Sequence, residues 1–285
     1  MRIAMTYTRL RTEERLLLDE CESLGAKVTP IDLRQAVFDP HDPGEWSRFD
    51  AVVERSVSLT SSRVVARLME SFGVRCVNPR ATIELCADKL VTSAALVAAC
   101  VPIPYMRVAT SPEAGMRGIE QLGYPAVLKP TIGSWGRLIA KVNDRDAAES
   151  VLEHRDTLGS VNHAVVYAQE HIEKPGRDLR VFVIGGEPVA AIARYSEHWV
   201  TNTARGARTE GIEISHEIRE ISAQAAAVVG GDAVAVDLLE CPERGLLVNE
   251  VNHSMEFRNS IDVTGVNIPG LLARHTLEIA AGERA

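Results

Sequence analysis

The chain has 285 residues, with 31 basic and 39 acidic side chains and a formal net charge of −8 at pH 7. A negative charge of this size does not suit a surface that coats DNA or RNA, so we expect no nucleic-acid partner. No apolar run approaches the roughly 18 residues that a membrane span needs, and we expect no membrane partner either. At about 150 residues per domain, the length predicts about two compact modules.

Five cysteines are spread along the sequence, and no two of them have the C-x-x-C spacing. An odd number of cysteines without that spacing indicates neither a disulfide framework nor a zinc site. The first residues form a strand-like segment without the apolar core and small-residue cleavage site of a signal peptide. The sequence therefore predicts reduced thiols and a protein that works in the cytoplasm.

The first hundred residues alternate short apolar segments with amphipathic ones. Strands are predicted at 2–7, 27–31, 51–54 and 75–77, and helices at 12–24, 63–72 and 81–100. The alternation of strands and helices predicts a small parallel sheet with helices on its faces. Pro102 and Pro104 force an extended chain after the last of these helices, so we expect a domain boundary near residue 105.

The remainder of the chain is richer in strands. Strands are predicted at 126–130, 137–142, 165–172, 179–184, 188–195, 233–240 and 245–252, and helices at 146–158, at 217–229 and after Pro269. Gly185 and Gly186 mark the turn of one hairpin. These elements predict an α+β half that is rich in antiparallel strands.

Acidic and amide side chains stand in two apolar strands that a short turn connects. A hairpin centred between Glu243 and Arg244 places Asp237 directly opposite Glu250, and Asn252 lies on the same face as Glu250. Two opposed carboxylates repel each other, and such oxygen donors suit Mg²⁺ or Mn²⁺. Two alternatives stay open: solvated carboxylates on the exposed face of a sheet, and a register shifted by one residue.

A lysine and a glycine-rich loop follow the strand predicted at 126–130. Lys129 ends this strand, and the loop carries Gly133, Ser134 and Gly136. Backbone N–H groups of such a loop can cradle phosphate oxygens while the lysine supplies a positive charge. The spacing matches neither the Walker pattern nor the dinucleotide fingerprint, and a plain hairpin loop is the alternative.

Four segments resemble, in their order along the chain, the motifs of ATP-grasp ligases, and more closely the LysX family of amino-group-carrier ligases related to the RimK peptide ligases. The segments are 129–137, 173–183, 198–206 and 249–260. The resemblance implies an α/β and α+β chain with the ATP-grasp fold. It implies an N-terminal preATP-grasp, Rossmann-like domain at 1–82, a helical linker and start of the ATP-grasp unit at 83–125, a central ATP-binding lid at 126–173 and a C-terminal antiparallel-sheet catalytic subdomain at 174–285.

The resemblance also implies a set of site residues. The nucleotide contacts are Lys89, Lys129, Gly133, Ser134, Trp135, Gly136, Gln169, Glu170, Ile172, Asp178, Arg180 and Asn202. Asp237, Glu250 and Asn252 match the family's metal ligands, with two Mg²⁺ ions expected and Mn²⁺ as an alternative. Lys129, Arg180 and Arg205 would stabilise charge during phosphoryl transfer, in which a carboxylate becomes an acyl phosphate and an amine then forms the amide.

The substrates follow from the same resemblance. Asn259 and Ser260 match a motif of the α-aminoadipate ligases, so the implied amine is L-2-aminoadipate. The remaining substrate contacts would be Arg194, Thr203 and Glu256, with Arg194 as a clamp for a carboxylate. The implied carboxylate partner is the C-terminal glutamate of LysW, a small acidic carrier protein, and the family implies a homodimer or homotetramer.

Several alternatives to this function stay open. The amine could be glutamate, as in the arginine branch of the family, or another amino acid in a secondary pathway. The protein could instead add glutamate to a protein tail, as RimK does, or bind ATP without turnover. Ala207 stands where the family has a second glycine after Gly206, so the loop near the acceptor site could have a different shape.

Overall fold

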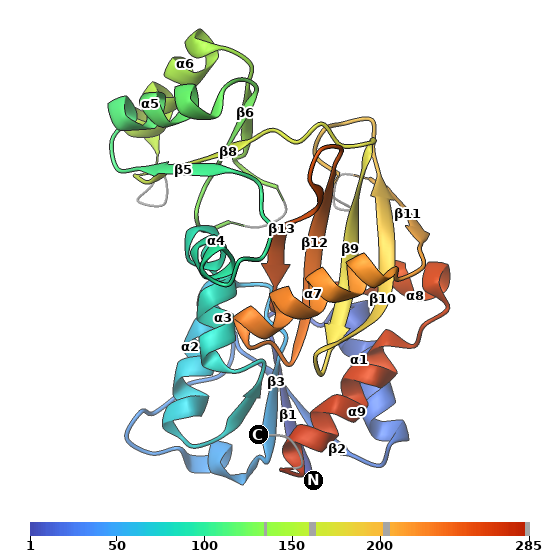
Figure 1. Ribbon diagram of the computed structural model, residues 1–285. Helices are drawn as coiled ribbons and strands as arrows, with labels where there is room; N and C mark the ends of the chain where they lie inside the picture. Colours follow the sequence, from blue (N-terminus) through green and yellow to red (C-terminus); the bar gives the residue numbers. More distant parts are fainter. Residues whose placement is uncertain (134–135, 160–163, 202–205, 283–285) are drawn as a thin grey trace.

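The computed structural model describes residues 1–133, 136–159, 164–201 and 206–282. In these residues the chain forms three β-sheets, one parallel and two antiparallel, in three units that follow one another along the sequence. The first and third units lie together, and the middle unit stands apart beyond helix α4 (Figure 1). This architecture confirms the expected α/β and α+β fold class.

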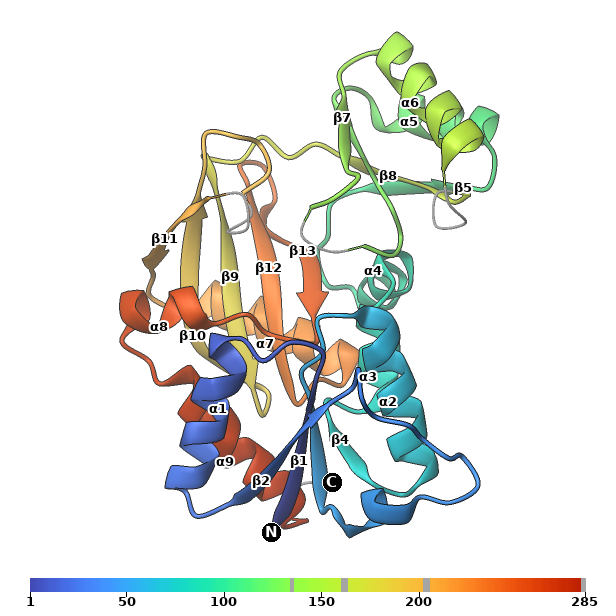
Figure 2. The same cartoon turned by 180° about the vertical axis from the view of Figure 1, so that it is seen from behind.

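The N-terminal unit alternates strands and helices as predicted. Its parallel strands have the order β2-β1-β3-β4, and apolar side chains of η1 and α2 cover one face of the sheet. The elements are β1 (Arg2–Tyr7), α1 (Thr12–Ser23), β2 (Lys27–Asp32), η1 (Gly44–Arg48), β3 (Ala51–Glu54), α2 (Leu59–Ser71) and β4 (Arg75–Val77). All four strands end at the same edge of the sheet, and this edge points toward the other two units (Figure 2).

The prediction of a single helix at 81–100 is wrong. The chain forms two helices there, α3 (Arg80–Cys86) and α4 (Lys89–Ala98). Asp88 separates them, because its backbone is extended and its carboxylate accepts hydrogen bonds from the first turn of α4, the shorter at 2.8 Å. Such a cap satisfies N–H groups that no helical carbonyl can reach. The break places Lys89 in the first turn of α4.

The middle unit is an antiparallel sheet of order β5-β8-β6-β7, covered by two helices (Figure 1). Its elements are β5 (Met106–Ala109), α5 (Pro112–Leu122), β6 (Ala126–Lys129), β7 (Ala140–Val142), α6 (Arg145–Leu158) and β8 (Val166–Glu170). The sequence did not predict β5 and α5, which lie in the range assigned to the linker. Ile119 of α5 is buried in the same core as Leu128 and Leu152. We therefore propose that the middle unit begins near residue 105.

The third unit is a five-stranded antiparallel sheet of order β11-β10-β9-β12-β13. Its elements are β9 (Arg177–Ile184), β10 (Glu187–Tyr195), β11 (Arg208–Gly211), α7 (His216–Val229), β12 (Ala233–Cys241), β13 (Gly245–Asn252), α8 (Arg258–Thr264) and α9 (Ile268–Ala280). Helix α7 covers one face. On the other face Phe182 of β9, Leu272 of α9 and Leu17 of α1 share one core, which joins this unit to the first. The sequence did not predict β11 and α8.

The β12–β13 hairpin pairs Asp237 with Glu250 as predicted, but the register next to the turn differs from the predicted one. Next to the turn, Cys241 lies opposite Gly245, one residue away from the predicted register. A β-bulge then leaves Asn249 without a partner on β12 and shifts the register by one residue. The bulge therefore restores the pairing of the two carboxylates, and both Asn249 and Glu250 reach the same cavity.

All five cysteines are free thiols in this structure. Among the described residues, none of the helices combines the length and the apolar character that crossing a membrane requires.

Candidate active site

A cavity of about 350 Å³ lies where the three units meet. The predicted site residues that line it are Lys89, Lys129, Gly133, Gly136, Gln169, Glu170, Ile172, Asp178, Arg180, Arg194, Asp237, Glu250, Asn252 and Glu256. Asn259 and Ser260 are not among its lining residues. Ser134, Trp135, Asn202, Thr203 and Arg205 lie outside the described residues. The structure thus gathers most of the predicted nucleotide and metal contacts from two separate sheets and from helix α4.

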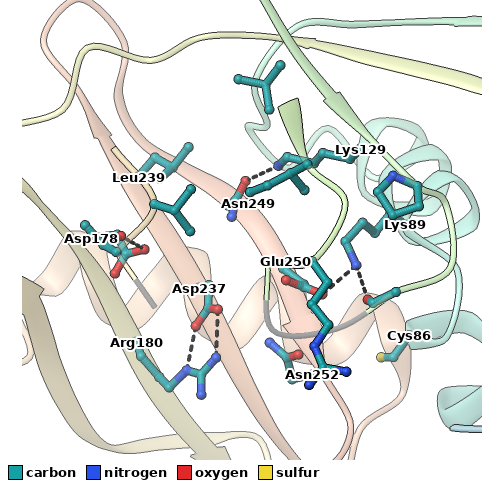
Figure 3. A pocket seen from close by; sticks show the side chains of 18 of the residues that line it. Cys86, Lys89, Lys129, Asp178, Arg180, Asp237, Leu239, Asn249, Glu250 and Asn252 are labelled. Carbon is teal, nitrogen blue, oxygen red and sulfur yellow. Dashed lines mark hydrogen bonds and ion pairs between the residues drawn. The ribbon is translucent and has the colours of Figure 1, made fainter. Parts of the chain in front are cut away.

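Two lysines approach the third unit from the opposite wall of the cavity (Figure 3). Lys129, at the end of β6, donates from Nζ to Oδ1 of Asn249 at 2.8 Å. Lys89 donates from Nζ to Oε1 of Glu250 at 2.9 Å and to the carbonyl of Gly133 at 2.7 Å. Burial lowers the pKa of Lys129 to about 8, against the opposing charge of Glu250. Two ammonium groups therefore face one part of the cavity, where they suit an anionic ligand such as a polyphosphate.

The acidic side of the cavity is a row of charges across the sheet. Arg180 of β9, Asp237 of β12 and Glu250 of β13 are successive partners in the strand register. Arg180 donates from Nε and Nη2 to the two oxygens of Asp237 at 2.7 and 2.8 Å (Figure 3). Burial alone would raise the pKa of Asp237, but the charges of Arg180 and Arg194 lower it to about 2. Asp237 is therefore ionised throughout the neutral range.

Arg194 is a buried partner of two carboxylates. Its Nε donates to Asp178 at 2.6 Å, and its Nη2 lies 3.2 Å from Asp237. Asp178 also accepts a hydrogen bond from the hydroxyl of Thr201. Because its guanidinium is already paired with two acids, we propose that Arg194 positions them. The role of substrate clamp that the resemblance assigned to it stays a prediction without support from this geometry.

The donors beside the lysines fit a divalent metal ion. Asp237 and Glu250 offer carboxylate oxygens, and the side chain of Asn252 lines the same cavity. Nδ2 of Asn252 is buried and has no hydrogen-bond partner among the described residues, so nothing there holds its amide group in place. The set consists of oxygen donors that suit Mg²⁺. Among the described residues no three His, Cys, Asp or Glu side chains gather at one point, and we propose that the amide oxygen of Asn252 completes the donor set.

The edge of the middle sheet forms the far wall of the cavity. Gln169 and Ile172 are buried there, at and just beyond the end of β8. The carboxylate of Glu170 turns toward the segment just before β5, where it accepts hydrogen bonds from the backbone N–H of Tyr105 and from Arg244. The guanidinium of Arg244 also lies over the ring of Tyr105, 4.2 Å from its centroid. This contact ties the β12–β13 turn to the segment that leads into β5 of the middle unit.

The two residues matched to the aminoadipate motif lie in α8. Ser260 is buried, and the carbonyl of Asn259 accepts from the hydroxyl of Thr209 at 3.3 Å. Helix α8 packs so closely on β11 that a Cβ atom at Gly211 would collide with the carbonyl of Val263. Ala207 is not among the described residues with positive φ, so an alanine is compatible with this backbone.

The sequence analysis missed the wall that the N-terminal unit contributes. Arg11 follows β1, Ser56 and Val57 follow β3, and all three line the cavity opposite Ser254 and Glu256. One signal in the sequence was available. Parallel strands present their carboxyl ends at one edge, and ligands bind at such edges, so the polar residues after β1 and β3 were candidates.

The fold and the cavity define the class of protein. Two antiparallel sheets face each other across the cavity, with lysines on one side and acidic residues on the other, which is the arrangement of an ATP-grasp enzyme. A family model of the RimK-like ATP-grasp domain matches residues 86–275, and one of the LysX preATP-grasp domain matches residues 3–85. The chain belongs to the RimK-like ATP-grasp family and is a carboxylate–amine ligase that uses ATP with a divalent metal ion.

Two relatives and one solved structure show how similar the chain is to known members. The alpha-aminoadipate–LysW ligase LysX of Sulfurisphaera tokodaii is 33% identical over 277 residues, which are 96% of this chain and 97% of that protein. The glutamate–LysW ligase ArgX of Sulfolobus acidocaldarius is 32% identical over 270 residues, 94% of this chain and 95% of that protein. The crystal structure of a RimK domain ATP-grasp protein from Sphaerobacter thermophilus has a TM-score of 0.78 at 27% identity, and covers 97% of this chain and 100% of that chain.

Proposed function

We propose that this ligase joins the C-terminal glutamate of a LysW-type carrier protein to the amino group of L-2-aminoadipate, in lysine biosynthesis. The observation that carries the proposal is the similarity, over nearly the whole chain, to relatives that are named as LysW ligases. The cavity supports it, because the lysines and acids that a phosphoryl transfer needs stand together in one place.

The first step activates the carrier. A carboxylate oxygen of the carrier's terminal glutamate attacks the γ-phosphorus of ATP, the bond to the β,γ-bridging oxygen breaks, and ADP leaves. Lys89, Lys129 and Arg180 would hold and neutralise the phosphate oxygens, since phosphoryl transfer depends mainly on positioning and charge. A divalent ion held by Asp237, Glu250 and Asn252 would cancel further charge on those oxygens.

The second step forms the amide. The amine nitrogen attacks the carbonyl carbon of the acyl phosphate, the carbon–oxygen bond to phosphate breaks, and the nitrogen loses a proton. Charge developing on the leaving phosphate would again fall to Lys129 and Arg180. Arg205 is expected to add to this stabilisation, although it lies outside the described residues. The middle unit would exclude water while the acyl phosphate exists.

Glutamate is the second candidate for the amine. A relative named glutamate–LysW ligase is almost as similar to this chain as one named for aminoadipate, at 32% against 33% identity. Asn259 and Ser260 support aminoadipate only by resemblance. Since neither lines the cavity, we propose that they act through the position of α8 and the segment before it.

The test offers each amine separately. The enzyme, ATP, Mg²⁺ and the LysW-type carrier of the same organism are incubated with L-2-aminoadipate or with L-glutamate, and ADP release and the intact mass of the carrier are measured. An adduct with aminoadipate alone is expected. An adduct with glutamate alone would move the protein to the arginine branch. Glutamate added to an acidic protein tail in place of the carrier would make it a RimK-like enzyme.

Three further expectations belong to this proposal. We propose a homodimer or homotetramer, which light scattering on the eluting protein would measure. We propose two bound Mg²⁺ ions that Mn²⁺ can replace, which titration calorimetry with a non-hydrolysable ATP analogue would count. We propose that the ligase works in the cytoplasm beside its carrier, which fractionation of cells would test.

A further inference from the structure

The cavity extends past the acidic row to a second end, which no proposed step has used. There the N-terminal unit supplies Arg11 and Ser56, and the segment after β13 supplies Ser254 and Glu256. Only three residues separate Asn252 from Glu256 along the chain, so this end begins a short distance from the proposed metal donors. If the lysines and the acidic row hold the nucleotide and its metal ion, this end is left for a second substrate.

Arg11 is held so that one donor remains for the cavity. Its Nε and Nη2 donate to the two oxygens of Glu14 at 3.0 and 2.8 Å. The side chain of Glu14 is fully buried and also accepts from Nε of Arg55 at 3.2 Å. The third nitrogen of Arg11, Nη1, donates to Oε1 of Glu256 at 2.9 Å. Glu14 therefore fixes the plane of the guanidinium, and Nη1 points at the carboxylate of Glu256.

The segment that carries Glu256 is anchored on both sides of this residue. Arg55 donates from Nη2 to the carbonyl of Met255 at 2.9 Å, and its guanidinium lies 5.6 Å from the centroid of Phe257. The side chain of Glu256 itself keeps 35% of its surface exposed, and that of Arg11 keeps 19%. In the described part of the chain no hydrogen bond reaches Oε2 of Glu256. A firm backbone thus presents a carboxylate that can move off its partner.

The charges at this end are balanced in pairs. Arg11 and Arg55 are positive, while Glu14 and Glu256 are negative. If a ligand carboxylate took the place of Glu256 on Nη1, Arg11 would keep its pairing, and Glu256 would be available for a positive group of the same ligand. An amino acid with two carboxylates and one ammonium group has this complement of charges. Guanidinium groups bind carboxylates strongly through charge-assisted hydrogen bonds.

We propose that Arg11 binds a carboxylate of the amine substrate, and that Glu256 occupies this position in the free enzyme. The inference rests on the proposed function, because it needs a dicarboxylic amino acid as the amine. It gives Arg11 the task that the resemblance had assigned to Arg194, whose Nε and Nη2 are paired with Asp178 and Asp237. Arg11 is a specificity-determining residue in this reading.

The test measures the coupling between Arg11 and each carboxylate of the substrate. The variant Arg11→Met is compared with wild type and with Arg15→Met, an exposed arginine one turn along α1. Each enzyme is assayed with L-2-aminoadipate, with 5-aminopentanoate, which lacks the α-carboxylate, and with L-norvaline, which lacks the distal one. If glutamate proves to be the substrate, 4-aminobutyrate and L-2-aminobutyrate take their places.

We expect wild type and Arg15→Met to prefer the full substrate over one analogue by about 10- to 100-fold in kcat/KM, as a hydrogen bond between charges implies. Arg11→Met should lose this preference for that analogue while its KM for ATP stays the same. The analogue concerned identifies the carboxylate that Arg11 binds. If Arg11→Met fails to fold, Arg11→Lys keeps a charge for Glu14, loses the fork geometry and should show the same loss.

Other outcomes would overturn the inference. A preference that is as large in the Arg11 variants as in wild type would show that Arg11 contacts neither carboxylate. A raised KM for the carrier with the preference intact would assign Arg11 to the carrier instead. If wild type forms no adduct with either dicarboxylic amino acid, the proposed function fails and the inference falls with it. If wild type forms the adduct but the preference for the full substrate does not depend on Arg11, the inference fails and the proposed function stands.

Discussion

Arg194 offers a direct test of whether a buried arginine holds the site together or binds substrate. Arg194, Asp178 and Asp237 are 3, 6 and 4% exposed, so none of the three charges is hydrated from bulk water. Replacing Arg194 with methionine keeps most of the volume and removes the charge. The two carboxylates would then stay buried with fewer partners.

The expected cost follows from the contacts that remain. Removing one member of a buried ion network costs about 3–5 kcal/mol, because the charges left behind are uncompensated. Asp237 keeps both hydrogen bonds from Arg180, and Asp178 keeps Thr201, with Lys174 at 3.8 Å. We therefore expect Arg194→Met to lower the free energy of unfolding by about 3 kcal/mol, at the lower end of that range.

Urea unfolding without ligands measures this loss. The matched control is Arg219→Met, since Arg219 is half exposed and lies 3.6 Å from Glu187, and such a pair contributes about 0.5 kcal/mol or less. The double variant Asp178→Asn, Arg194→Met removes one of the orphaned charges and should recover part of the stability. An Arg194→Met enzyme as stable as wild type, with a raised KM for the amine alone, would refute the positioning role and restore the clamp.

Three more predictions concern a buried acid, the contact between Arg244 and Glu170, and a helix cap. Burial raises the pKa of Glu54 from its ordinary 4.5 to about 7, so the free energy of unfolding of wild type should fall by about 3 kcal/mol as pH rises from 4.5 to 7. Urea unfolding at several pH values should show this fall in wild type but not in Glu54→Gln. Arg244→Ala removes the contacts with Glu170 and Tyr105, and steady-state kinetics should show a KM for ATP about fivefold higher. A fivefold change corresponds to a loss of about 1 kcal/mol of interaction free energy. Asp88→Ala removes the cap of α4 and should cost about 1 kcal/mol in thermal unfolding and weaken ATP binding through Lys89. The first prediction would be contradicted if wild type and Glu54→Gln showed the same pH dependence of stability. The second would be contradicted by an unchanged KM for ATP in Arg244→Ala, and the third by an unchanged melting temperature in Asp88→Ala.

The sequence predicted the parts of the fold that depend on local patterns. The alternation of apolar strands and amphipathic helices was sufficient for the parallel sheet and for α7, because periodicity records which side of an element is buried. It failed at β5, where no residue is buried and apolar and polar residues do not alternate by face, and at α5, where Gly115 and Gly118 weaken the helical pattern. It also failed at Asp88, where a capping residue stands inside an apolar stretch and the pattern alone predicts one continuous helix.

The site was predictable where residue type carries the chemistry. The glycine-rich loop, Lys129 and the paired acids could be found because few other roles suit that combination. Arg11 and Ser56 were missed, since a charged residue and a serine after short strands look like ordinary loop residues. The role proposed for Arg11 depends on its contacts with Glu14 and with Glu256, and Glu256 lies 245 positions away in the sequence. Such pairings follow only from the packing of the first unit on the third.

The register of the sheet decides which charged side chains meet, and the acidic pair was predicted correctly because the register assumed next to the β12–β13 turn was off by one residue and the bulge compensates for it. Both hairpins of the third unit contain a bulge, one at Asn249 on β13 and one at Val189 on β10. If cross-strand partners are counted from each turn without the bulge, every pair beyond the bulge is wrong by one residue. An error of one residue assigns a side chain to the opposite face of the sheet. In the first hairpin this count would place Arg194 opposite Arg177, whereas the bulge places it opposite Asp178.

The consequence is a sheet in which opposite charges meet along two neighbouring rows. One row holds Arg194 beside Asp178, and the other holds Arg180, Asp237 and Glu250. Cross-strand neighbours of opposite charge stabilise each other, whereas like charges in these positions would repel. Asp237 and Glu250 are the exception, since they are adjacent and both negative. Arg180 balances the first and Lys89 the second, and Lys89 lies at the start of α4, outside the sheet, so the repulsion is relieved only when the N-terminal end of α4 lies against β13.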